Sequence, residues 1–321
     1  MLLTIQPFTE ITTSLGESPV WDHQTSTLYW VDILEKKVYI CNALSSNEIK
    51  TLHFSKQISS LALATGKNAI ITLEDGFYLL DLKTGTTVLI QHVEKELLEN
   101  RFNDGKCDAS GRFFAGTMNK FYKHHQAGLY CLHRNFQVEQ KMFNMNLANG
   151  IAWSTNNKLM YVVDSLEKVI YQFNYNMNES RMYNKKICID FQNEAGYPDG
   201  ITIDEQDMLW VAHWEGAKIS RWNPKTSKKI DEIILPALKI TSCTFGGKHL
   251  NELFITTASE GMSNEQLKKY PMSGRMFRIK LPISGRESYR YSIPEQCLEA
   301  KNQTENLIKE EQPIKADSYK R

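Results

Sequence analysis

Apolar and polar residues alternate in short stretches along the whole chain, and these stretches recur in one form. Each begins with a short alternating strand, continues through a polar turn of four to six residues, and ends in a more apolar strand. The copies begin at intervals of 41–50 residues, near Glu17, Ile58, Asn103, Asn149, Asp199 and Thr241. A period of roughly 40–50 residues built from strands is typical of β-propeller blades.

Further strand-like sequence follows these pairs, most clearly at residues 128–142, 168–183 and 217–233. Four strands in each of six units, with no sustained 3.6-residue periodicity, predict an all-β six-bladed β-propeller with four-stranded antiparallel blades. The ring must also close, because an unpaired edge strand promotes aggregation. We expect residues 4–11 to form the outer strand of the last blade and residues 274–282 to form its third strand.

The composition narrows the choice of partners. The chain has 321 residues, of which 41% are hydrophobic and 23% charged, and its formal net charge of +1 favours neither nucleic acid nor a membrane surface. We find no signal peptide and no apolar run long enough to span a bilayer, so we expect a cytoplasmic protein, either a monomer or a weak homodimer. The six cysteines have no paired spacing and are expected to be reduced thiols.

The strand pattern ends near residue 292, where the sequence becomes polar and charged. We therefore predict a propeller domain over residues 1–292 and a flexible polar tail over residues 293–321.

Polar residues at the blade starts are the candidate site. The first strand of each blade should line the central channel, so Glu17, Asn103, Asn149 and Asp199 should meet at one mouth of it. Asp-Gly and Asn-Gly are common turn dipeptides, and a turn is the simpler interpretation of any one of them. Their repetition at equivalent positions favours a cation site instead, and oxygen ligands suit Ca²⁺, Mg²⁺ or Mn²⁺, with Zn²⁺ also possible.

The stretch "RFNDGKCDASGRFFAGTM" (101–118) places two more candidates at this mouth. Arg101 stands just before the channel-lining strand and offers a planar set of donors for carboxylate or ester oxygens. We expect Asp104 to contact the site residues or to pack between blades without touching the ligand, and we expect Lys106 to have a structural role. The loops that follow the second strands should form the walls of the pocket, with residues 119–128 as a lid and residues 259–274 as a second long loop.

Five motifs together resemble one family. "GESPVWD", "RFNDGKCDASGRFFAGTM", "NGIAWS", "YPDGITIDEQDMLWVA" and "TSCTFGG" are similar, in the same order, to the SMP-30/gluconolactonase/luciferin-regenerating family. The resemblance implies a six-bladed propeller and one divalent metal ion held by Glu17, Asn149 and Asp199. It also implies that Arg101 and Asn103 contact the substrate, a sugar lactone or another cyclic ester.

The chain departs from this family after "AGTM". Animal relatives carry acidic residues there, whereas this chain has Asn119, Lys120 and Phe121. The substrate is then expected to be less polar than a sugar lactone, or to be anionic and to meet Lys120. We take Lys120 and Phe121 as further substrate-binding candidates.

These observations predict a metal-dependent lactonase in which Asp199 is both a metal ligand and the catalytic base. Two alternatives remain open. The propeller could be a non-catalytic calcium-binding protein or scaffold, because one fold supports many functions. It could also hydrolyse another ester or a phosphotriester at the same ion.

Overall fold

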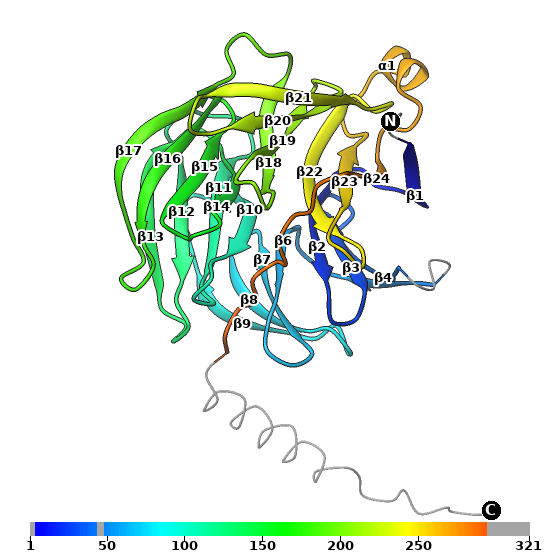
Figure 1. Cartoon of the computed structure of the whole chain (residues 1–321). Coiled ribbons are helices and arrows are strands. Elements are labelled where there is room, and N and C mark those ends of the chain that lie inside the picture. Colours follow the sequence, from blue (N-terminus) through cyan, green and yellow to red (C-terminus); the bar gives the residue numbers. More distant parts are fainter. Residues whose placement is uncertain (1–3, 44–47, 294–321) are drawn as a thin grey trace, which may run out of the picture.

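The computed structural model describes residues 4–43 and 48–293, which form six four-stranded antiparallel sheets arranged around a central axis (Figure 1). The predicted six-bladed β-propeller is confirmed. The first strands of neighbouring blades contact one another around the axis, as expected for the strands that line a channel.

The first three blades each use four consecutive strands. Blade 1 contains β2 (Gly16–Asp22), β3 (Thr27–Asp32), β4 (Lys37–Asn42) and β5 (Ile49–His53). Blade 2 contains β6 (Ile58–Leu63), β7 (Asn68–Leu73), β8 (Gly76–Asp81) and β9 (Thr87–His92). Blade 3 contains β10 (Asn100–Cys107), β11 (Phe113–Asn119), β12 (Ala127–Leu132) and β13 (Val138–Met145).

Blades 4 and 5 repeat this order, and blade 6 combines both ends of the described chain. Blade 4 contains β14 (Ala148–Trp153), β15 (Leu159–Asp164), β16 (Val169–Asn176) and β17 (Arg181–Asp190). Blade 5 contains β18 (Tyr197–Ile203), β19 (Leu209–Trp214), β20 (Lys218–Asn223) and β21 (Lys228–Ile234). Blade 6 contains β22 (Lys239–Gly246), β23 (Glu252–Ala258), β24 (Arg275–Lys280) and β1 (Ile5–Thr12).

The N-terminal strand closes the ring as predicted. β1 pairs antiparallel with β24, so that Ile5 lies opposite Ile279 and Pro7 lies opposite Phe277. The edge of β24 is therefore covered by a strand from the other end of the propeller. The short helix α1 (Asn264–Lys269) lies in the loop between β23 and β24, and no helix in the described ranges is long and apolar enough to cross a bilayer.

Large apolar side chains fill the space between blades. Trp21 of blade 1 stacks on Phe254 of blade 6 with ring centroids 5.4 Å apart, and Phe114 of blade 3 meets Trp153 of blade 4 edge to face. Such aromatic contacts fix the spacing of neighbouring sheets. The blades are thus held mainly by apolar packing, which keeps the first strands close around the axis.

One feature was not predicted from the sequence. After β24, residues 282–293, which we call the strap, run across the turns that join first and second strands, at the end of the channel opposite the blade starts (Figure 1). The strap makes a hydrogen bond to every blade. The partners, from blade 1 to blade 6, are Asp22, Leu63, Gly111, Thr155, Glu205 and Leu250.

The strap also anchors the end of the described chain. Tyr291 is completely buried, its hydroxyl donates to the carbonyl of His133 at 2.6 Å, and Ile293 packs in the same apolar cluster. Residues 294–321 of the predicted tail lie outside the described residues.

We predict that Tyr291→Ala lowers the free energy of unfolding by about 3–5 kcal/mol, because it removes a fully buried aromatic ring and leaves a cavity under the strap. Urea unfolding followed by tryptophan fluorescence measures this change. The control is Tyr183→Ala on β17, whose side chain is 42% exposed and whose loss should change the free energy of unfolding by less than about 1 kcal/mol. Equal effects of the two substitutions would contradict the anchoring role of the strap.

Candidate functional site

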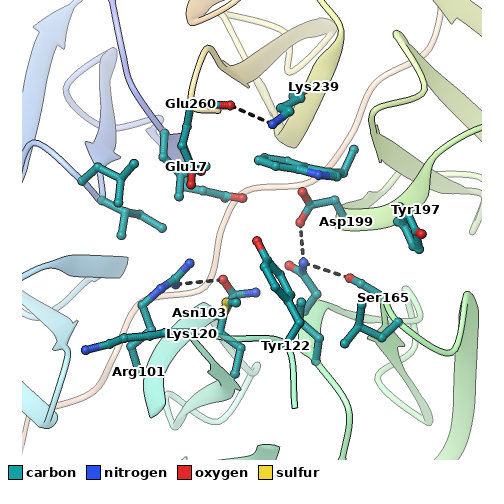
Figure 2. A pocket seen from close by; sticks show the side chains of 18 of the residues that line it. Glu17, Arg101, Asn103, Lys120, Tyr122, Ser165, Tyr197, Asp199, Lys239 and Glu260 are labelled. Carbon is teal, nitrogen blue, oxygen red and sulfur yellow. Dashed lines mark hydrogen bonds between the residues drawn. The ribbon is translucent and has the colours of Figure 1, made fainter. Parts of the chain in front are cut away.

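A cavity of about 490 Å³ opens at the end of the channel where the first strands begin, and every blade contributes to its lining. Six of the residues expected at the site line this cavity: Glu17, Arg101, Asn103, Lys120, Asn149 and Asp199 (Figure 2). Residues far apart in the sequence therefore meet at one mouth, as the repeat pattern predicted.

A local irregularity of the first strands presents these side chains. The pairing register between first and second strands shifts next to Glu17, around Asn103, next to Asn149 and next to Asp199. A bulge of this kind redirects a side chain that would otherwise follow the regular alternation of the strand. The polar residue can then face the cavity while its neighbours pack between blades.

The equivalent positions of blades 2 and 6 carry hydroxyl groups that bond within the protein. Ser59 donates to the carbonyl of Phe102 at 2.6 Å, and Thr241 donates to the carbonyl of Gly16 at 2.6 Å. These two blades therefore connect the ring of first strands and add no acidic group to the site.

Glu17 and Asp199 are two carboxylates buried in the same pocket. Burial and the repulsion by Asp199 and Asp104 raise the pKa of the Glu17 carboxyl well above its usual range. Burial and the repulsion by Asp104 raise the pKa of Asp199 in the same way. Without a compensating positive charge, two ionised carboxylates at this place destabilise the fold.

Asn149 lies beside this pair, and only the nitrogen of its side-chain amide is hydrogen-bonded. Its side-chain amide donates to Asp199 Oδ1 at 2.5 Å and to Ser165 Oγ at 3.1 Å (Figure 2). Its oxygen Oδ1 is fully buried and has no hydrogen-bond partner. A buried acceptor without a donor is unfavourable.

The three residues fit a divalent cation. Two carboxylates and an unpaired amide oxygen are the donor types that hard cations prefer, and a bound cation would relieve both the repulsion and the unpaired oxygen. Among the described residues no group of three or more His, Cys, Asp and Glu side chains could hold a metal, so the amide oxygen of Asn149 is needed to complete this set.

Arg101 and Asn103 form a second pair in the cavity. The Nη1 atom of Arg101 donates to the Phe102 carbonyl at 2.8 Å and to Asn103 Oδ1 at 3.1 Å, and Asn103 Nδ2 donates to the Ala148 carbonyl at 3.2 Å. Arg101 is only 9% exposed, and burial lowers the pKa of its guanidinium. Asn103 thus fixes the orientation of Arg101.

The lid loop after β11 differs from the prediction at one residue. Phe121 is 68% exposed and is not part of the cavity lining, whereas the next residue, Tyr122, lines the cavity and points into its centre (Figure 2). The side chain of Asn119 causes this arrangement, because its oxygen accepts from the Phe121 N–H at 3.0 Å and holds the loop in a turn. Tyr122 has a φ of 56°, a left-handed value that is rare for an aromatic residue.

Glu215 and Glu260 come from loops after second strands, as expected, whereas Lys239 begins the first strand of blade 6. Lys239 Nζ donates to the Glu260 carbonyl at 2.7 Å and lies 4.5 Å from the centre of the Trp214 ring. Glu215 is 3.8 Å from the same ammonium group. Lys239 was not among the predicted site residues, although it occupies the place in blade 6 that Arg101 occupies in blade 3, two residues before the polar position.

The two residues expected to be supporting lie deeper in the channel. Asp104 accepts from the N–H of Gly105 at 2.7 Å and raises the pKa values of both acidic site residues. Lys106 Nζ donates to the Ile201 carbonyl at 2.6 Å, a structural contact to blade 5.

Comparison with known proteins identifies the family. The family model described as SMP-30/gluconolactonase/LRE-like region matches residues 15–259. Regucalcin of Gallus gallus is 36% identical over 284 residues, which cover 87% of this chain and 95% of that protein. The chain belongs to the SMP-30/gluconolactonase/LRE-like family.

Other members agree with this assignment. Regucalcin of Sus scrofa is 35% identical and covers 86% of this chain and 94% of its own length. The structure of a luciferin-regenerating enzyme superposes with a TM-score of 0.86 at 28% identity, covering 91% of this chain and all of that one. A structure named as a calcium-binding protein, regucalcin, from Agrobacterium tumefaciens has the same TM-score at 23% identity, which supports the fold of the family.

We predict that, without added metal, this protein becomes more stable as the pH is lowered from 8 towards 5. The raised pKa values mean that the folded state binds protons at Glu17 and Asp199 more tightly than the unfolded state, so stability falls as the pH rises above the ordinary carboxyl range. Melting temperatures of the EDTA-treated protein across this pH range measure the effect.

Glu17→Gln should raise the melting temperature of the metal-free protein at pH 7 by a few degrees and should flatten its dependence on pH. Asp231→Asn on β21, an exposed position, is the control and should change neither. A metal-free protein that is most stable at pH 8, with or without Glu17→Gln, would show that burial and repulsion do not raise the pKa values of these two carboxyls.

Proposed function

We propose that this protein is a lactonase that uses one divalent metal ion to hydrolyse a sugar lactone or a similar cyclic ester. The observation that carries the proposal is the group of Glu17, Asp199 and Asn149, in which two buried carboxylates and an unpaired amide oxygen line one cavity. Membership of a family whose name includes gluconolactonase supports the reaction type.

Glu17, Asn149 and Asp199 would hold the ion, which is Ca²⁺, Mg²⁺, Mn²⁺ or Zn²⁺. When bound, such an ion polarises the ester carbonyl and stabilises the negative charge that develops on its oxygen.

Asp199 is the proposed base. Its carboxylate would accept a proton from the attacking water as the water oxygen bonds to the carbonyl carbon. The ring C–O bond then breaks, and the proton passes to the departing ring oxygen, which leaves an open-chain hydroxy acid. The N–H of Asn149 that bonds to Asp199 Oδ1 would keep this carboxylate in position through the reaction.

Arg101 and Tyr122 would orient the substrate. The guanidinium is held by Asn103 and can donate to oxygens of the ring, which limits the number of ways the lactone can bind. The ring of Tyr122 covers the centre of the cavity and would exclude bulk water (Figure 2).

A calcium-binding role without turnover is the second candidate, because one structural neighbour is named a calcium-binding protein and the proposed ligands are all oxygens. A panel of lactones, simple esters and a phosphotriester, assayed by acid release, separates the candidates. EDTA-treated protein would be reloaded with Ca²⁺, Mg²⁺, Mn²⁺ and Zn²⁺ in turn. Turnover of a lactone with at least one ion supports the lactonase; tight Ca²⁺ binding without turnover of any compound supports the second candidate.

We predict that Asp199→Asn lowers the rate of lactone hydrolysis by roughly 10²–10⁴-fold and that saturating metal does not restore it. The substitution keeps an oxygen at the ion but removes the basic carboxylate. Steady-state rates at increasing metal concentration test this expectation.

Asn149→Ala is the matched variant, since Asn149 can supply only a neutral ligand. Its loss should weaken metal binding, and excess metal should restore a large part of the rate. Full recovery of Asp199→Asn at high metal concentration would exclude Asp199 as the base and leave its role as a ligand.

A further inference from the structure

We propose that the substrate of this cavity carries a carboxylate group in addition to its lactone ring, and that Arg101 and Lys120 bind this carboxylate. The inference rests on the proposed function, whose substrate class it narrows. It concerns the wall that blade 3 contributes to the cavity.

Arg101 is a buried cation without a carboxylate in direct contact. Among the described residues no carboxylate lies within 4.0 Å of its guanidinium, and its only hydrogen bonds are those of Nη1 to Phe102 and Asn103. The Nε and Nη2 atoms, which together form one edge of the guanidinium, have no acceptor in this part of the chain. That edge matches the two oxygens of a carboxylate.

Lys120 places a second cation on the same wall. Arg101 lies opposite Met118 in the β10–β11 pairing, and the N–H of Lys120 donates to the Glu99 carbonyl at 2.8 Å, which continues that register. Residues two apart on a strand share a face, and Met118 and Lys120 both line the cavity, as Arg101 does.

Glu74 holds Lys120 from the far side. Its carboxylate lies 2.9 Å from Lys120 Nζ, and it also accepts from the N–H of Gln57. Glu74 does not line the main cavity. An ammonium group has three donors, so this ion pair positions Lys120 without using all of them. With Arg101 unpaired, the wall has one positive charge in excess.

Glu17, Asp199 and Glu260 also line the cavity and attract the Arg101 guanidinium, but none of their carboxylates lies within 4.0 Å of it. Glu215 lies within 4 Å of Lys239, and the Glu260 carbonyl accepts from the same ammonium, on the opposite side of the cavity (Figure 2). Asn103, the neutral neighbour of Arg101, has its oxygen and its nitrogen engaged within the protein. The hydroxyl groups of an uncharged sugar would leave the free edge of the guanidinium without a carboxylate in contact, whereas a substrate carboxylate supplies one.

The test compares two lactones that differ at one carbon. D-Glucaro-1,4-lactone has a carboxylate where D-glucono-1,4-lactone has a hydroxymethyl group. We expect kcat/KM of the metal-loaded protein to be at least about tenfold higher for the glucarolactone, the size of one charge-assisted hydrogen bond. A 6-phosphogluconolactone arm tests the type of anion, and a preference for it over the glucarolactone would overturn the carboxylate assignment.

Lys120→Met should reduce the preference for the glucarolactone about tenfold, and Lys120→Glu should reduce it further. Lys123→Met is the matched control, because Lys123 lies on the same loop but pairs with Glu99 outside the cavity, so the preference should stay unchanged. Equal efficiency for the two lactones, or equal effects of Lys120→Met and Lys123→Met, would overturn the proposal.

Binding of the open-chain acids separates this proposal from the lactonase function. Calorimetry with glucarate and gluconate needs no turnover, and we expect glucarate to bind about tenfold more tightly in a manner that depends on Lys120. Such binding without hydrolysis of any lactone would refute the lactonase and keep the carboxylate site. Hydrolysis of both lactones with equal affinity for the two acids would refute the carboxylate site alone.

Discussion

The close approach of six strands around one axis is the constraint on which the rest of the structure depends. The space is so small that a Cβ atom at Gly150 would lie 2.6 Å from the Asp199 carbonyl, and one at Gly200 would lie 2.2 Å from Ser242 Oγ. Gly150 follows Asn149 and Gly200 follows Asp199, and the absence of a side chain at these two glycines lets neighbouring blades approach this closely. The bulges then direct the preceding side chains, Asn149 and Asp199, into the cavity, so packing around the axis and presentation of the site have one cause.

The same geometry concentrates unfavourable electrostatics at the mouth. Glu17 and Asp199 are buried together, and the amide oxygen of Asn149 has no donor. The propeller can tolerate this local cost because its stability arises elsewhere, in the apolar packing between blades and in the strap that joins all six turns at the opposite end. A site that destabilises the metal-free fold is also a site where a cation contributes stability when it binds.

The sequence predicted the blades and the polar residues that line the cavity because both follow a local pattern that repeats. Alternation with period two marks each strand, and the polar residue occurs at the same place in each copy, so Glu17 and Asp199 could be aligned without knowing any distance. Two features had no such pattern. The strap lacks alternation, and its partners are turns that become neighbours only after the ring closes. Tyr122 lines the cavity in place of the predicted Phe121 because of the turn that Asn119 holds and the left-handed backbone at Tyr122. Neither feature can be predicted from the amino-acid composition of the loop.

The cavity is lined by two groups of residues, one on the first strands and one in the loops at the rim, and these groups differ in how many other contacts they make. The proposed metal ligands lie on bulges of first strands, where a change of side chain or backbone would disturb two neighbouring blades at once. Lys120, Tyr122 and Glu260 lie in loops that follow second strands, at the rim, where a substitution affects few other contacts. Reaction chemistry and substrate choice can therefore vary separately in this architecture. A lysine on the rim next to a buried, unpaired arginine changes the charge of one wall and leaves the ring of ligands as it is, so selection for an anionic substrate requires no rearrangement of the propeller.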